Sequence, residues 1–152
     1  ARWFRRQMRG VRAETTLAIV RMLDKAMNNT SLILLFEVGG ECFLFPGDAQ
    51  IENWQYALSQ KKTLALLKRV TLYKVGHHGS LNATPKSMWA LFKDRGKSQL
   101  TSLLSTLAGV HGEKNEVPRG KLVTELKAKS TLVSTEDYAA DELRRETVID
   151  FS

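Results

Sequence analysis

The first patterned segment of the chain is an amphipathic helix at residues 13–27. Its apolar residues recur every three or four positions, and Arg21, Asp24 and Lys25 take the opposite side. The apolar stripe consists of Leu17, Val20, Leu23 and Met27, widened by Ile19 and Ala26. Asn28-Asn29 suits the end of this helix, because asparagine tolerates the left-handed conformation that commonly follows a last turn.

A β-hairpin is predicted next. Residues 31–38 and 41–45 are rich in apolar and aromatic residues, and Gly39-Gly40 between them is typical of a two-residue hairpin turn. Pro46-Gly47 ends the second strand, and Asp48 follows where a helix can begin.

After the hairpin, helical and strand-like segments alternate. Thr84-Pro85 suits a helix start, with Thr84 as the cap and Pro85 at the first helical position. The expected helices are 49–58, 63–68, 84–92 and 119–129, and the expected strands are 70–75, 100–106, 131–134 and 147–151. This alternation favours an α/β fold with a mixed sheet flanked by helices.

The composition predicts one globular domain. The chain has 152 residues, of which 43% are hydrophobic and 26% charged, as is usual for a soluble protein. The sequence has no apolar run long enough for a membrane span and no secretory signal. The single cysteine, Cys42, lies in an apolar run and is interpreted as a small buried residue in a reducing, cytoplasmic compartment.

The formal net charge is +7, and part of it is concentrated at the start of the chain. Five arginines alternate there with Trp3, Phe4 and Met8, namely Arg2, Arg5, Arg6, Arg9 and Arg12. Such a patch can neutralise phosphates while its aromatic residues stack on bases, which would make nucleic acid a partner. The alternatives are a solvated face, or a surface that packs against another part of the protein.

Two loops place metal-competent side chains directly after a predicted strand. In the first, Asp48 follows Pro46-Gly47, where its carboxylate could ligate a metal, act as a base or cap the next helix. In the second, Gly76-His77-His78-Gly79-Ser80 follows the strand at 70–75. Adjacent histidines point in different directions, so one can bind a metal while the other orients a neighbour, contacts substrate or transfers a proton.

Together these loops resemble a known family. Asn29-Thr30-Ser31-Leu32-Ile33-Leu34-Leu35 with Phe43-Leu44-Phe45-Pro46-Gly47-Asp48-Ala49 is similar to the fourth motif region of metallo-β-lactamase-fold hydrolases. Leu72-Tyr73-Lys74-Val75-Gly76-His77-His78-Gly79-Ser80 is similar to the fifth. The branch most like this chain includes the soluble hydrolase domain of DNA-uptake competence proteins, and the resemblance covers about Asn28 to Phe92.

The resemblance implies an αββα sandwich that holds one or two metal ions, usually zinc, at the edge of its two sheets. It implies that Asp48 bridges two metals, that His77 is a metal ligand, and that His78 acts beside them as a catalytic or substrate-contacting residue. Ser80, in the same loop, would contact substrate. In such sites the nucleophile is a metal-bound water whose pKa is lowered towards 7.

The chain departs from the family pattern in its missing first half. The His-x-His-x-Asp-His cluster of the family has no counterpart here, and the three histidines are His77, His78 and His111. His111 lies in a Gly-Val-His-Gly loop, where it either approaches the same cleft and contacts substrate or is an ordinary loop residue. The opening residues Ala1 to Arg6 look like a point within a longer chain.

Two functions are therefore expected from the sequence. The first is the carboxy-terminal half of a metal-dependent hydrolase of phosphate esters or nucleic acids, with residues 1–27 as a basic arm and helix and residues 28–152 as the half-domain. The isolated chain would then be weakly active or inactive. The second is a non-catalytic binding or assembly module that self-associates through the surface that the missing half would cover.

Overall fold

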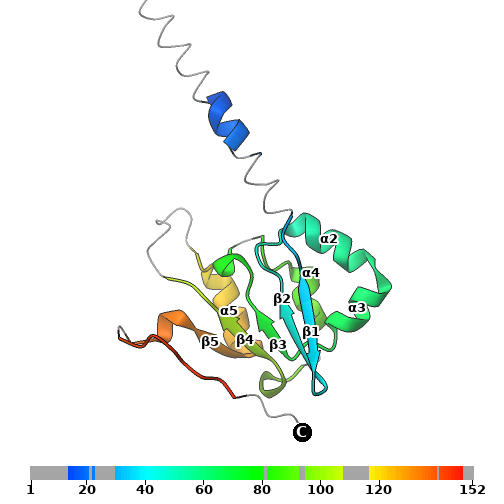
Figure 1. The fold of residues 1–152 in the computed structure, drawn as a ribbon, viewed down its shortest axis with the longest axis vertical. Helices are drawn as coiled ribbons and strands as arrows, with labels where there is room; N and C mark the ends of the chain where they lie inside the picture. Colours follow the sequence, from blue (N-terminus) through cyan, green and yellow to red (C-terminus); the bar gives the residue numbers. More distant parts are fainter. Residues whose placement is uncertain are drawn as a thin grey trace, which may run out of the picture.

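The computed structural model describes residues 14–20, 22, 30–80, 82–92, 95–107, 117–139 and 141–148. They include one five-stranded sheet and the helices packed on it (Figure 1). In chain order the strands are β1 (Leu34–Val38), β2 (Glu41–Phe45), β3 (Leu72–Lys74), β4 (Thr101–Leu104) and β5 (Thr131–Ser134). The helices are α2 (Ile51–Ser59), α3 (Lys61–Leu67), α4 (Lys86–Trp89) and α5 (Gly120–Lys129), with single 3-10 turns at His77–Gly79, Ala90–Phe92, Lys97–Gln99 and Thr135–Asp137.

The hairpin of β1 and β2 is confirmed. The two strands are antiparallel, and Val38 pairs with Glu41 across the turn. Gly39 and Gly40 have φ angles of 58° and 89°. A two-residue turn of this kind needs positive φ at both central residues, and glycine adopts it without strain.

The remaining strands are parallel, and each is reached through a helical crossover. Strands β2, β3, β4 and β5 lie side by side in chain order. Crossovers of one hand that always add the next strand on the same side leave their helices on one face of the sheet. Figure 1 shows this arrangement, with α4 and α5 behind the strands and α2 and α3 beside β1. The predicted α/β class with a mixed sheet flanked by helices is confirmed.

The helix-covered face of the sheet contains the core. Five paired residues form one row across it, namely Leu35, Leu44, Tyr73, Ser102 and Leu132. The helices and their connections add the buried Trp54, Leu67, Met88, Phe92 and Leu126 to the same cluster. Met88 and Phe92 come from α4 and from the 3-10 turn that follows it, and both are buried in this core.

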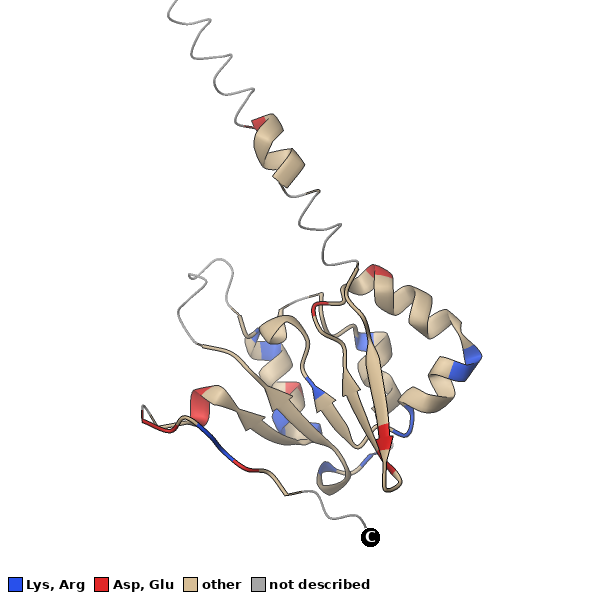
Figure 2. Ribbon diagram, viewed as in Figure 1, with Lys and Arg blue, Asp and Glu red and all other residues tan. Residues whose placement is uncertain are grey.

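The opposite face of the sheet is apolar and, among the described residues, carries no helix. Its central row is Phe36, Phe43, Leu72, Thr101 and Thr131. On the edge strand β1, Leu34, Phe36 and Val38 are 45%, 49% and 52% exposed. Figure 2 shows that charged residues gather on helices, turns and the C-terminal segment and are sparse on the strands. We call this surface the open face.

Cys42 is buried on β2, as the sequence indicated. Its amide donates a hydrogen bond to the Thr71 hydroxyl at 3.1 Å. Burial, together with the nearby charge of Glu37, raises the pKa of the Cys42 thiol. A thiol of this kind stays protonated and is chemically inert.

The predicted helix at 13–27 is described only in part. Residues 14–20 and 22 are helical, and the other residues of that prediction lie outside the described part of the chain. Leu17, Ile19, Val20 and Met22 are each more than half exposed. The basic segment before this helix also lies outside the described residues, so the division of the chain after residue 27 stays a prediction.

Most predicted helices and strands differ from the observed ones by one to three residues at their ends, and two predictions need a correction of their own. The helix after the histidine loop begins at Lys86 with Pro85 as its cap residue, because the Thr84 hydroxyl lies 2.7 Å from that of Tyr73 instead of capping the helix. Thr147 and Val148 are not in a strand, and the rest of the strand predicted at 147–151 lies outside the described residues.

Where helices are described, each is too short or too polar to cross a membrane.

Candidate functional site

The two predicted loops meet at one edge of the sheet. Strands β2 and β3 are parallel neighbours, so the loops that follow them start from the same edge. The backbone N–H of His77 donates a hydrogen bond to Gly47 O at 3.2 Å. A Cβ atom on Gly76 would lie 3.0 Å from Gly47 O and 3.2 Å from Pro46 Cγ, which is too close for an ordinary contact. Glycine at position 76 therefore lets the two loops touch.

Asp48 is exposed on the first of these loops. Its possible role as a helix cap is excluded by the structure, since the cap residue of α2 is Gln50. The Gln50 amide donates to the Asn53 side chain at 3.2 Å, which satisfies one of the free amides at the helix start. Asp48 is thus not needed to begin α2, and a ligand role stays open to its carboxylate.

His77 and His78 both adopt left-handed backbone conformations, with φ angles of 41° and 53°. This conformation costs a residue with a side chain on the order of 1–2 kcal/mol, and such strain is concentrated at functional sites. Hydrogen bonds hold the strained turn in place. Gly79 N donates to Gly76 O at 2.9 Å, Ser80 N donates to His77 O at 2.9 Å, and Arg119 N donates to Gly79 O at 3.1 Å.

The structure gives the two histidines different surroundings. The His78 ring is exposed, and its Nδ1 lies 2.8 Å from Ser105 O at the end of β4. A carbonyl can only accept, so Nδ1 is the donor in this bond. His77 is half-buried beside Gly47, and the two ring centroids are 6.4 Å apart. This separation is compatible with His77 as a metal ligand beside Asp48 and His78 as a proton-transfer or substrate-contacting group.

Replacing His77 with glycine is expected to give a more stable protein than replacing it with alanine. At an ordinary helix or strand position, glycine is the less stable of the two by about 0.5–1 kcal/mol. At a φ of 41° the order is reversed, because glycine relieves the left-handed strain and alanine keeps it. Urea unfolding of the two variants measures the difference, which we expect to be about 1 kcal/mol in favour of glycine. A more stable alanine variant would show that the turn is unstrained.

The structure says less about the roles of Ser80 and His111, the other two predicted site residues. Ser80 is half-buried and closes the turn, since its amide donates to His77 O and its carbonyl accepts from Ala83 N at 3.4 Å. Its predicted contact with substrate is not tested by these bonds. His111 lies in the segment 108–116, outside the described residues.

The residues that anchor the histidine loop to the core were not identified from the sequence. Trp54 on α2 donates from Nε1 to Ala83 O at 3.1 Å, and the Tyr73 hydroxyl lies 2.7 Å from Thr84 Oγ1. Both contacts tie the chain just after the loop to the core. Lys74 was not identified either, although a lysine within an otherwise apolar strand is itself a signal.

Because Tyr73 is buried, we expect the folded protein to lose stability at alkaline pH. Burial raises the pKa of Tyr73 to about 12, against the smaller opposing effect of its hydrogen bond to Thr84. Above pH 10 the unfolded chain loses the phenol proton while the folded chain keeps it, so stability falls as the pH rises from 10 towards 12. Two pKa units correspond to roughly 3 kcal/mol.

Substituting phenylalanine for Tyr73 is the control for this effect. The variant loses the hydrogen bond to Thr84 and should be about 1 kcal/mol less stable at pH 7. Between pH 10 and pH 12 it should lose less stability than the wild type, measured by denaturant unfolding. Parallel curves for the two proteins would show that Tyr73 ionises as readily in the folded state as in the unfolded one.

The described residues do not form a complete zinc site. Within the described ranges there is no group of three or more His, Cys, Asp and Glu side chains that could hold a metal ion. Protein zinc sites use at least three protein ligands. Asp48 and His77 can therefore supply only two of the three or more protein ligands that a zinc site uses.

Comparison of the chain with models of known protein families, with curated proteins and with solved structures found no match. The resemblance to metallo-β-lactamase-fold hydrolases thus depends on the two loop motifs alone.

Proposed function

We propose that this chain is one part of a metal-dependent hydrolase of phosphate esters or nucleic acids, similar to the carboxy-terminal half of metallo-β-lactamase-fold enzymes. The observation that carries the proposal is the contact between the two strand-end loops, where His77 N donates to Gly47 O beside Asp48. A carboxylate and an imidazole on neighbouring loops at the carboxyl ends of parallel strands are residue types that metal centres use at such an edge. Zinc is the metal we expect, and when bound it would supply an activated water.

The open face supports the same proposal. A sheet with apolar residues on both faces needs a second layer on each of them, and the helices cover one. In an αββα sandwich the second layer would be another sheet, which would also bring the ligands that the described residues lack. The residues at the edge of the sheet where the two loops meet would then lie between the two layers.

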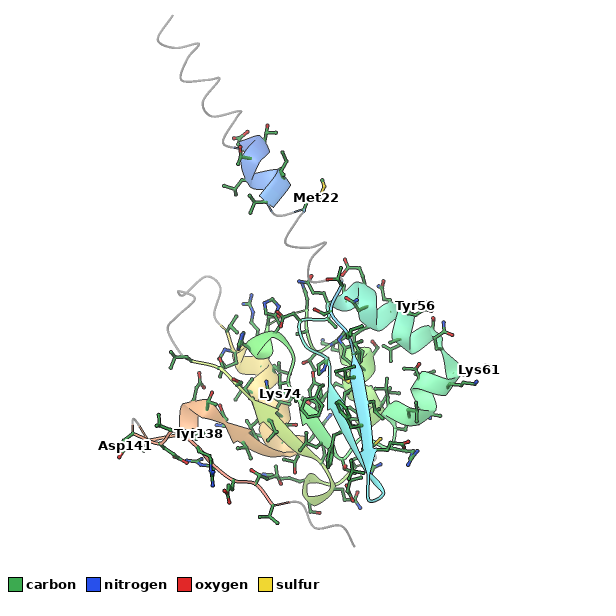
Figure 3. The ribbon with its side chains drawn as sticks, in the orientation of Figure 1. Met22, Tyr56, Lys61, Lys74, Tyr138 and Asp141 are labelled. Atoms are coloured by element: carbon green, nitrogen blue, oxygen red, sulfur yellow. The ribbon has the colours of Figure 1, made fainter. Side chains whose placement is uncertain are left out.

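The proposal predicts slow, metal-dependent hydrolysis by the chain alone. With bis-nitrophenyl phosphate and added zinc or manganese, we expect turnover at least about a thousandfold below the roughly 10 s⁻¹ of an average enzyme. Asp48→Asn should lower this rate to that of the free metal ion. Asp141→Asn is a matched control, because Asp141 is exposed on the C-terminal segment, far from the loops (Figure 3). Hydrolysis that does not respond to metal removal or to Asp48→Asn would count against the function, and turnover at an ordinary enzymatic rate would count against an incomplete site.

A second candidate function is a non-catalytic assembly module, and the half-exposed Leu34, Phe36 and Val38 favour it. If the open face joins two copies of the chain, light scattering should find dimers at high concentration. Phe36→Lys should restore the monomer, because it places a charge between the half-exposed Leu34 and Val38 on β1. Leu143→Lys is the matched control, since Leu143 is 98% exposed on the C-terminal segment. A wild-type chain that stays monomeric at high concentration would remove this candidate.

The partners and location of the protein are part of the same proposal. Nucleic acid is a candidate substrate or ligand because the net charge is +7 and the first residues of the sequence are rich in arginine. A single buried cysteine without a disulfide partner supports a reducing compartment, which we take to be the cytoplasm.

A further inference from the structure

Lys74 is a charged residue on the open face of the sheet. It is the last residue of β3 and pairs with Leu103 on β4. The residue before it, Tyr73, points to the helix side, where its ring lies against Trp89 and Phe92. Side chains alternate along a strand, so Lys74 points to the opposite face. Figure 3 labels Lys74 on the central strand β3 and Lys61 far from it, at the junction of α2 and α3.

The ammonium of Lys74 is half-buried without a contacting carboxylate among the described residues. Its Nζ donates one hydrogen bond, to Val75 O at 3.2 Å. An ammonium has three donors, so donors remain for another ligand. Taking a charge partly out of water destabilises a fold unless a partner compensates for the lost hydration.

The negative charge of Asp48 acts on Lys74 without touching it. Burial lowers the pKa of Lys74, and the negative charge of Asp48 opposes that shift. Lys74 also stands three residues before His77 on the strand that ends at the histidine loop. The lysine therefore belongs to the edge where the two loops meet, but it is not neutralised there by direct contact.

We propose that Lys74 is an anion-binding residue that receives a phosphate oxygen at this edge of the open face. Lysine binds phosphate as a compact point charge, and a phosphate group has enough oxygens to use the donors that Val75 leaves. The further statement that this phosphate belongs to the substrate rests on the function proposed above. The binding of phosphate by Lys74 does not.

The inference is tested with metal-free protein, so that metal binding plays no part. Inorganic phosphate is titrated in the presence of a chelator and at constant ionic strength, and backbone amide resonances of residues 74–79 are followed by NMR. We expect saturable shifts in the wild type and an affinity at least about tenfold weaker in Lys74→Met, because the charge-assisted hydrogen bond is lost. Lys61→Met is the matched control and should bind as the wild type does, because Lys61 is exposed on α3.

A third variant separates anion binding from simple neutralisation of Asp48. If Lys74 binds phosphate, Asp48→Asn should tighten phosphate binding in metal-free protein, because it removes a nearby negative charge. If Lys74 served only to neutralise Asp48, Lys74→Met would bind phosphate as tightly as the wild type, which would overturn the proposal. Equal weakening by Lys61→Met and Lys74→Met would also overturn it, since binding would then reflect net charge alone.

The melting temperature of Lys74→Met shows whether weaker phosphate binding could come from loss of folding. Removal of a half-buried ammonium that lacks a contacting carboxylate should leave the melting temperature unchanged or raise it, and circular dichroism checks this. The two proposals also fail separately. Phosphate binding that depends on Lys74 without metal binding by Asp48 and His77 would reject the hydrolase and keep the anion site, and the reverse result would reject only the anion site.

Discussion

Trp54→Ala is expected to destabilise the protein by about 3–5 kcal/mol, the usual range for removing a fully buried tryptophan. Trp54 is completely buried on α2 and belongs to the core cluster that joins the helices to the sheet. Its Nε1 also donates to Ala83 O, so the variant leaves a buried carbonyl without its donor. Because most small domains have a total stability of about 5–15 kcal/mol, this single change should bring the protein close to unfolding at room temperature.

Two comparison variants show how much of this lost stability comes from the hydrogen bond and how much depends on burial. Trp54→Phe keeps most of the packing and loses the hydrogen bond, and should cost about 1–3 kcal/mol. Tyr56→Ala, on the same helix but 74% exposed, should change stability by no more than about 0.5 kcal/mol. Urea unfolding followed by far-ultraviolet circular dichroism measures all three. A cost for Trp54→Ala similar to that for Tyr56→Ala would show that α2 does not pack as described.

Gly79→Ala has the second-largest expected effect and acts on the candidate site itself. Gly79 has a φ of 80°, which costs alanine about 1–2 kcal/mol. The added Cβ would also lie 2.9 Å from Pro118 Cβ and 3.3 Å from Leu104 Cδ1. Overpacking of this kind costs a further 1–3 kcal/mol or so, giving about 2–5 kcal/mol in total. The contact between the histidine loop and the segment before α5 should be lost first, because Arg119 N donates to Gly79 O.

Gly120→Ala is the matched control, since a Cβ at Gly120 would meet nothing within 4 Å. It stands at the start of α5, where alanine is the better helix former, and should be neutral or slightly stabilising. Denaturant unfolding and the backbone NMR shifts of residues 76–80 measure both variants. A Gly79→Ala protein with wild-type stability and unshifted loop resonances would contradict the close packing of this loop.

Local patterns predicted most of the fold. The turn at Gly39-Gly40 and the strands at 41–45 and 131–134 were predicted at their observed bounds, because turn residues and short apolar runs mark strand ends locally. The start of α4 was misplaced by one residue because Thr84 has a tertiary partner, Tyr73, that a local pattern does not reveal. An uncovered sheet surface was expected only from the family resemblance, and the strand order explains it, since successive crossovers of one hand leave their helices on one face.

The candidate site was predicted in its residues but not in its geometry. Asp48 and His77 were each predicted on a loop that directly follows a strand, and the structure joins these loops through Gly47. The left-handed backbone at His77 and His78 was not predicted, because histidine in that conformation is uncommon and has no sequence signal. The bond from His78 to Ser105 depends on β3 lying next to β4, which no motif encodes.

The most direct test of the central claim, that this chain holds two ligands of a metal site it cannot complete, is a zinc titration of the purified chain by calorimetry. The account predicts less than about a tenth of an equivalent of zinc after dialysis, because two ligands hold zinc weakly. It also predicts weak binding on titration that is lost in Asp48→Asn and in His77→Gln and kept in Asp141→Asn. A chain that retains a full equivalent of zinc, or binding that neither Asp48→Asn nor His77→Gln weakens, would contradict the claim.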